Sequence, residues 1–138
     1  EVRELTEGET VSYGGLYPPA GETPASWPRR IATLPLGYAD GYRRALGNHA
    51  VALVHGTRVR VAGAVTMDMT MLDVTDVPCA VGDVATLIGA DGADQLTIQD
   101  VAHFGHPSQL SPYELLTGLH SRLPRVYHEL QASLREQS

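Results

Sequence analysis

The sequence predicts a mainly β domain: an antiparallel β-barrel or sandwich with two or three short helices near the C-terminus. Short apolar runs separated by glycine, proline and aspartate fill the chain up to Leu96, a spacing typical of antiparallel strands. Helix-start patterns occur only after Leu96. The 138 residues are 43% hydrophobic and 19% charged, which suits one globular domain with a buried core.

The N-terminal part is expected to contain two short strands and a loop. Val2 and Leu5 allow one strand in a polar opening segment. Val11–Tyr17 predicts a second strand, which carries Tyr13. Pro18–Pro28 holds four of the nine prolines and no apolar periodicity, which predicts an exposed loop. Trp27 is expected to pack back on the body, because a solvated indole would leave a large apolar surface in water.

The stretch Ile31–Arg44 combines a strand with a loop rich in aromatic and charged side chains. Ile31–Leu36 is an apolar run long enough for one strand. In the following Gly37-Tyr38-Ala39-Asp40-Gly41-Tyr42, the glycines permit a tight turn and Asp40 can hydrogen-bond its own backbone. The loop then ends in Arg43-Arg44. From these residues alone, a surface loop with packed aromatics and a binding loop both remain open.

The middle of the chain predicts a run of antiparallel strands. Ala50–His55 and Arg58–Val65 read as a half-buried hairpin, with arginines facing water and valines facing the core. Gly63 inside the second strand indicates a bulge or a close backbone approach. Two further strands and one polar turn are expected at Met67–Val77, Asp83–Ile88 and Asp91–Asp94.

Two helices are predicted after Leu96. Thr97 and Asp100 have the spacing of a capping box, and Gly105 would end that helix. Ser111, Pro112 and Glu114 have the cap, first-position and third-position residue types of a second helix, expected to run to about Leu119. Residues 121–127 are expected to be extended around Pro124. The tail 128–138 is expected to be helical or frayed.

Composition excludes several classes of protein. A net charge of −6 and scattered arginines disfavour a nucleic-acid partner. No apolar run approaches transmembrane length and no signal-type leader opens the chain, so neither a membrane nor secretion is expected. The single Cys79 excludes an internal disulfide and fits the reducing cytoplasm. A start at Glu1 without methionine suggests an excised or processed piece.

No metal site is predicted. His103 and His106 lie three residues apart, but Gly105 and Pro107 would break a helix there, and no second pair of ligands is evident. Asp40 and Asp68 could be paired carboxylates for hydrolysis. Turn-capping aspartates are far more common, so that alternative carries little weight.

Five motifs occur in one order along the chain. They are Val11-Ser12-Tyr13-Gly14, Gly37-Tyr38-Ala39-Asp40-Gly41-Tyr42, Val65-Thr66-Met67-Asp68, Tyr113-Glu114-Leu115-Leu116 and Arg122-Leu123-Pro124-Arg125-Val126-Tyr127. In these motifs, their order and their approximate spacing, the chain resembles the C-terminal domain of alanine racemase, an enzyme that depends on pyridoxal phosphate (PLP). The resemblance covers residues 1–127 and leaves 128–138 as a tail.

The resemblance implies a catalytic role for Tyr13. Racemisation requires a proton-transfer group on each face of the substrate, while PLP spreads the negative charge of the carbanion. In the family a lysine works on one face, and the tyrosine of the first motif, supplied by the other subunit, works on the opposite face. Without the resemblance, Tyr13 would be read as a packed strand aromatic. A free phenol has a pKa of about 10, so a catalytic tyrosine needs nearby positive charge or hydrogen bonds to ionise.

The resemblance also implies an entrance for the substrate. Tyr38, Arg44, Met67 and Asp68 match residues at the family's substrate entrance or the rim of its active site. Tyr113 matches a tyrosine that narrows the entrance and contacts the cofactor phosphate. The alternatives are plain structural roles: a solvated Arg44, a core Met67 and a packed helix aromatic at Tyr113.

The chain departs from the family pattern at several points. Ala64 stands where an arginine is usual, and Arg43 where a proline is usual, which leaves substrate preference open. All ten basic residues are arginine, so the chain lacks the lysine that holds PLP as a Schiff base.

The partners implied by the resemblance are an N-terminal PLP-binding barrel and the second subunit of a homodimer, with D-alanine destined for peptidoglycan. The isolated chain should bind PLP weakly and racemise nothing. A racemase acting on serine or a broader range of amino acids, and a non-catalytic interaction module, remain the alternatives.

Overall fold

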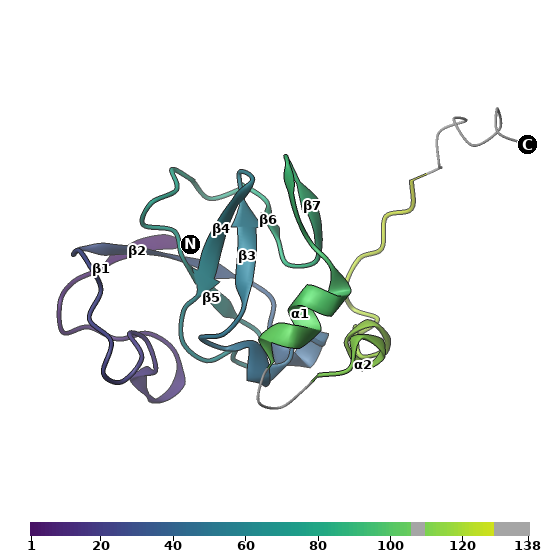
Figure 1. Ribbon diagram of the computed structural model, residues 1–138, viewed down its shortest axis with the longest axis horizontal. Coiled ribbons are helices and arrows are strands. Elements are labelled where there is room, and N and C mark those ends of the chain that lie inside the picture. The colour runs from purple at the N-terminus through teal and green to yellow at the C-terminus, as the bar shows by residue number, and fades with distance from the viewer. Residues whose placement is uncertain (106–109, 129–138) are drawn as a thin grey trace, which may run out of the picture.

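The computed structural model, drawn in Figure 1, describes residues 1–105 and 110–128. Within these residues, every strand pair is antiparallel. Six strands form one open sheet in the order β1-β2-β5-β4-β3-β6, and two more form a separate hairpin. The strands are β1 (Val2–Leu5), β2 (Arg29–Leu34), β3 (Val51–Val54), β4 (Thr57–Val61), β5 (Thr70–Asp73), β6 (Ala85–Thr86), β7 (Gly89–Asp91) and β8 (Asp94–Leu96). The predicted mainly β fold is confirmed.

The β3–β4 hairpin shows how the sequence sets the register. Val54 pairs with Thr57 across a two-residue turn, in which His55 and Gly56 both have positive φ, of 49° and 71°. Val59 is buried and Arg58 is exposed. The predicted alternation of core-facing valine and water-facing arginine is therefore confirmed.

Two apolar clusters make up the core. The larger lies between β3, β4, β5, the β7–β8 hairpin and the two helices. The smaller gathers at the β1–β2 end of the sheet, where Leu5, Tyr17 and Ile31 are buried. Trp27 packs against this second cluster, which confirms that the proline-rich loop folds back on the body.

Four predicted strands are wrong in extent or kind. Val11–Tyr17 is a tight loop, closed by one bridge between its end residues, with a 3₁₀ turn at Tyr13–Gly15. Ser12, Gly14 and Gly15 all have positive φ there, which reverses the chain where a strand would run on. The strand predicted at Met67–Val77 is only β5, because residues 66–69 form a hydrogen-bonded turn.

The predicted strand Asp83–Ile88 is likewise only the two-residue β6, and Gly89 opens β7 instead of closing a strand. The strand predicted at Arg58–Val65 ends at Val61. Gly63 then turns with a φ of 77°, and a Cβ there would lie 2.6 Å from Cβ of Ser12. The predicted close backbone approach at Gly63 is confirmed.

Both C-terminal helices are present. Helix α1 (Ile98–Phe104) begins with the predicted capping box, in which the Asp100 amide donates to Oγ1 of Thr97 and the Thr97 amide donates to the Asp100 carboxylate. Helix α2 (Pro112–Thr117) has proline at its first turn but gains no side-chain cap from Ser111. It ends two residues before the predicted Leu119. Residues 121–127 contain no regular helix or strand, and residues 129–138 of the tail lie outside the described part.

Candidate functional site

Tyr13 lies at the start of the 3₁₀ turn Tyr13–Gly15 and presents a half-exposed ring, with 51% of its surface accessible. The Gly15 amide donates to the Ser12 carbonyl across the turn, at 3.2 Å. Oγ of Ser12 donates to the Ala64 carbonyl at 2.7 Å. The turn is therefore tied to residues 63–68, a segment remote in sequence, while the Tyr13 ring stays accessible.

The loop of residues 37–44 lies directly on that same segment. The Tyr38 amide donates to the Thr66 carbonyl and the Ala39 amide donates to the Met67 carbonyl, both at 2.9 Å. A Cβ on Gly37 would lie 2.2 Å from the Thr66 carbonyl oxygen, so the approach requires glycine. The structure thus brings Tyr38 next to Met67, and both side chains are exposed.

Asp40 fixes the shape of this loop from within. Its carboxylate is buried, accepts the Gly37 amide at 3.0 Å, and accepts two N–H groups of Arg122, one of them at 2.8 Å. The hydrogen bonds from Arg122, followed by that from Gly37, lower the pKa of Asp40 to about 2. The predicted bond from Asp40 to its own backbone is confirmed. A carboxylate engaged in this way is a structural group, unlike the exposed Asp68.

Asp40 is expected to make the fold sensitive to acid. Its pKa is lowered in the folded state, so its contribution to stability is complete above about pH 4 and is lost as the pH falls from about 4 to about 2. Asp40→Asn should reduce the free energy of unfolding at neutral pH by about 2 kcal/mol and flatten the decline between pH 4 and 2. Urea unfolding at a series of pH values measures both effects.

Asp94→Asn is the matched control for Asp40→Asn. Asp94 pairs with Arg58 at 2.8 Å, but both side chains are substantially exposed. Solvent screens such a pair, so its loss should leave the urea midpoint almost unchanged. Equal losses in the two variants would contradict the assignment of Asp40 as an internal support.

Helix α2 closes the other side of the loop. A Cβ on Gly41 would lie 2.4 Å from the Gly118 carbonyl oxygen, so the loop backbone touches the end of α2. Nη2 of Arg43, which occupies the position where proline was expected, donates to the Glu114 carbonyl at 3.4 Å. Tyr113 lies on this helix and is 79% exposed, so it is not a packed helix aromatic. Arg44 is exposed at the start of another 3₁₀ turn, Arg44–Leu46.

The candidate residues therefore lie on four segments joined by direct contacts: the turn of Tyr13, residues 63–68, the loop 37–44 and helix α2. Figure 1 shows this side of the molecule along its lower edge, from the purple loops after β1 to α2. We call this surface the tyrosine edge. The four segments carry Tyr13, Tyr38 and Tyr113, whose side chains are all exposed. Phenols can donate hydrogen bonds to a phosphate or exchange a proton with a substrate.

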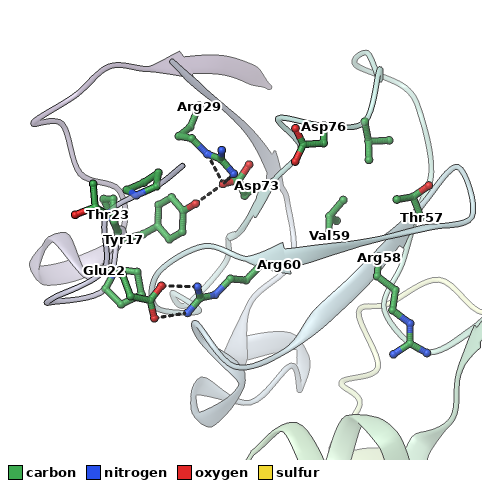
Figure 2. Close-up of a pocket in the computed structure, with 14 residues that line it drawn as sticks. Tyr17, Glu22, Thr23, Arg29, Thr57, Arg58, Val59, Arg60, Asp73 and Asp76 are labelled. Atoms are coloured by element: carbon green, nitrogen blue, oxygen red, sulfur yellow. Dashed lines mark hydrogen bonds and ion pairs between the residues drawn. The ribbon is translucent and has the colours of Figure 1, made fainter. Parts of the chain in front are cut away.

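A separate cleft of about 420 Å³ lies beneath the proline-rich loop, and none of the candidate residues lines it. In Figure 2, Tyr17 and Arg29 both point toward Asp73, and Arg60 points toward Glu22. The ion pairs of Arg29 with Asp73 and of Arg60 with Glu22 measure 2.8 and 2.7 Å. The charges that line the cleft are thus largely neutralised by one another.

Tyr17 lines this cleft, and its environment argues against a proton-transfer role. Burial, together with the hydrogen bond that it donates to Asp73, raises the pKa of Tyr17 to about 12. Tyr17 is 4% exposed, whereas Tyr13 is half exposed four residues earlier. Of these two tyrosines, only Tyr13 is accessible to a substrate.

The described residues give no sign of a metal centre or a membrane span. No group of three or more His, Cys, Asp or Glu side chains among residues 1–105 and 110–128 could hold an ion, and His106 lies outside these ranges. Within the same ranges, no helix is long and apolar enough to cross a membrane.

Comparison with known proteins identifies the family. The model of the alanine racemase C-terminal domain matches residues 1–127. Alanine racemase of Methylacidiphilum infernorum is 40% identical over an alignment of 138 positions, which covers 99% of this chain and 33% of that protein.

Solved structures agree with this match. Alanine racemase of Bartonella henselae, with covalently bound pyridoxal phosphate, has a TM-score of 0.75 at 28% identity, over 93% of this chain and 33% of that one. Histidine racemase of Leuconostoc mesenteroides has a TM-score of 0.75 at 35% identity, over 91% of this chain and 31% of that one. The chain spans about a third of the length of each of these relatives, and it belongs to the family of alanine racemase C-terminal domains.

Proposed function

We propose that the chain forms one wall of the active site of a PLP-dependent alanine racemase and contributes Tyr13 as the proton-transfer group for one face of the substrate. The observation that carries this proposal is the placement of Tyr13: an accessible phenol on a turn that is tied to the segment of Met67. In a family whose members racemise amino acids, such a phenol is suited to give and take a proton at the substrate α-carbon.

The tyrosine edge fits part of a PLP site and lacks another part. The chain has no lysine, so the amine that bonds to PLP must come from a different domain. PLP, when bound, would spread the negative charge that develops at the α-carbon. Tyr113 would donate a hydrogen bond to the cofactor phosphate. The rim formed by Tyr38, Arg44, Met67 and Asp68 would admit a small amino acid and exclude larger ones.

The proposed partners follow from the same missing lysine. An N-terminal barrel would supply the lysine and most phosphate contacts, and a second subunit would complete a homodimer in the cytoplasm. Tyr13 would then act in an active site whose lysine belongs to the other subunit. The chain on its own is expected to be inactive.

A hybrid enzyme tests the proposal. In this hybrid, the chain replaces the segment that it matches in the M. infernorum alanine racemase. The hybrid should interconvert L- and D-alanine with PLP, whereas the 138-residue chain alone should show no turnover above the PLP background. A folded, PLP-loaded hybrid without turnover would contradict the proposal and favour a non-catalytic interaction module. Turnover by the chain alone would contradict the shared site.

A second candidate is a racemase of another amino acid. The similarity to the histidine racemase of L. mesenteroides favours it, since that protein shares the fold and 35% identity over 91% of this chain. Ala64, in place of the usual arginine, is buried in the rim segment, residues 63–68, which carries Met67 and Asp68. Turnover of serine, histidine and alanine by the same hybrid, compared as kcat/KM, separates the two candidates.

A further inference from the structure

We propose that Asn48 is the positioning residue that holds the turn of Tyr13 in its working place. The inference rests on the proposed function, in which Tyr13 transfers the proton. Asn48 follows the 3₁₀ turn Arg44–Leu46 and has a φ of 58°, a conformation that asparagine tolerates better than most residues. It lies outside all five motifs of the family resemblance.

The side chain of Asn48 joins two segments that are distant in sequence. Its Nδ2 donates to the Leu16 carbonyl at 2.8 Å, and its Oδ1 accepts the Gly63 amide at 2.7 Å. The Asn48 amide donates back to the Gly63 carbonyl at 3.0 Å. One residue thus locks the end of the Tyr13 turn to the start of the rim segment 63–68.

Inside the bridge between Val11 and Tyr17 that closes the loop, the turn has few hydrogen bonds to the rest of the molecule. Ser12 ties the beginning of the turn to the Ala64 carbonyl, and Leu16, the next residue after the turn, is tied by Asn48. Leu16 is 47% exposed and Tyr13 is 51% exposed, so apolar packing does little to hold either side chain. Removal of the Asn48 side chain would leave the turn attached through Ser12 and through the bridge between Val11 and Tyr17, but would remove the hydrogen bond at Leu16.

The backbone of Asn48 is itself supported. Nε of Arg60 donates to the Asn48 carbonyl at 3.1 Å, and Arg60 is paired with Glu22 at 2.7 Å. Both polar groups of the backbone and both ends of the side-chain amide therefore have partners. Because all of these groups are hydrogen-bonded, Asn48 is a rigid anchor for the turn.

The first test measures motion of the turn in the full 138-residue chain. Asn48→Gly keeps the backbone conformation and removes both side-chain bonds. Asn48→Asp keeps the shape and the acceptor for Gly63, but directs an oxygen at the Leu16 carbonyl. NMR order parameters of the Gly14 and Gly15 amides should fall to about 0.6 or below in both variants, from values near those of rigid backbone in the native chain.

One amide in each of two other turns is the control for this test. Val77 and Asp83 donate to Val74 and Ala80 at 3.1 Å, in a region away from Asn48. Their order parameters should not change. Unchanged order parameters at Gly14 and Gly15 would overturn the inference, whatever the enzyme assay shows.

The second test measures catalysis in the hybrid enzyme. Asn48→Asp should lower kcat by about 10- to 100-fold with KM changed less than about twofold, because a small displacement of a proton-transfer group is costly to rate. The α-deuterium isotope effect on kcat/KM should rise in one reaction direction only, since Tyr13 serves one face. A general loss of structure would reduce the amount of active enzyme without this asymmetry.

Tyr13→Phe in the same hybrid distinguishes the two possible failures. If Tyr13→Phe retains full activity, the proposed function fails, and the order parameters alone judge the contact made by Asn48. If Tyr13→Phe abolishes activity while Asn48→Asp keeps native kcat and isotope effects, the positioning role is overturned.

Discussion

Replacement of Tyr13 by phenylalanine in the hybrid enzyme is expected to lower kcat for alanine by about 10³-fold, with KM changed little. The variant keeps the ring and removes only the hydroxyl, so the turn and its bonds through Ser12 remain. One face of the substrate would then lack a group to give or take the proton. Circular dichroism or polarimetry with L- and D-alanine measures the loss in both directions.

Tyr127→Phe is the matched control for Tyr13→Phe. Tyr127 is also exposed, at 88%, and lies in the irregular segment after α2. The activity of the Tyr127→Phe hybrid should stay within about twofold of that of the unaltered hybrid, as expected of a surface substitution with little effect on stability. Equal activity of the two variants would remove Tyr13 from the reaction.

Among the four substitutions tested by urea unfolding, Gly41→Ala should produce the largest loss in the free energy of unfolding, about 4 kcal/mol. Gly41 has a φ of 107°, which costs any residue with a Cβ, and the added carbon would lie 2.4 Å from the Gly118 carbonyl oxygen and 2.8 Å from its carbon. Both atoms belong to the backbone, so relief requires the loop to separate from the end of α2. Urea unfolding of the chain measures the loss.

Gly82→Ala separates the two causes. Gly82 has a similar φ of 101°, but nothing lies within 4 Å of the position of its Cβ. Gly82→Ala should therefore lose only the free energy that a positive φ costs a residue with a Cβ, about 1–2 kcal/mol. If both variants lose the same amount, the contact between the loop and α2 does not contribute to stability.

Local patterns in the sequence were sufficient for the elements whose causes are local. The β3–β4 hairpin follows from alternating Arg and Val around a glycine turn, and α1 follows from the Thr97–Asp100 capping box. The segment Val11–Tyr17 has the residue composition of a strand. Its conformation is decided instead by three successive contacts with residues 48, 63 and 64, which no local pattern contains.

The candidate site divides in the same way. The family motifs identified Tyr13, Tyr38, Arg44, Met67, Asp68 and Tyr113, and the structure brings the segments that carry them into contact. Their roles in catalysis remain predictions. The long-range bonds that support them were missed, because the bond between Asp40 and Arg122 spans 82 positions and that between Asn48 and Leu16 spans 32. The only sequence signal for Asn48 was the turn-forming dipeptide Gly47-Asn48.

The two hydrogen bonds that join the loop 37–44 to residues 66 and 67 use only main-chain atoms. Exchange of the side chains at positions 38, 39 or 67 therefore leaves the joint intact, provided that Gly37 is kept. The scaffold and the surface proposed to meet the substrate can in this way change independently during evolution. A domain of this shape can be adapted from one amino acid to another by side-chain replacement at the rim, without redesign of the fold beneath it.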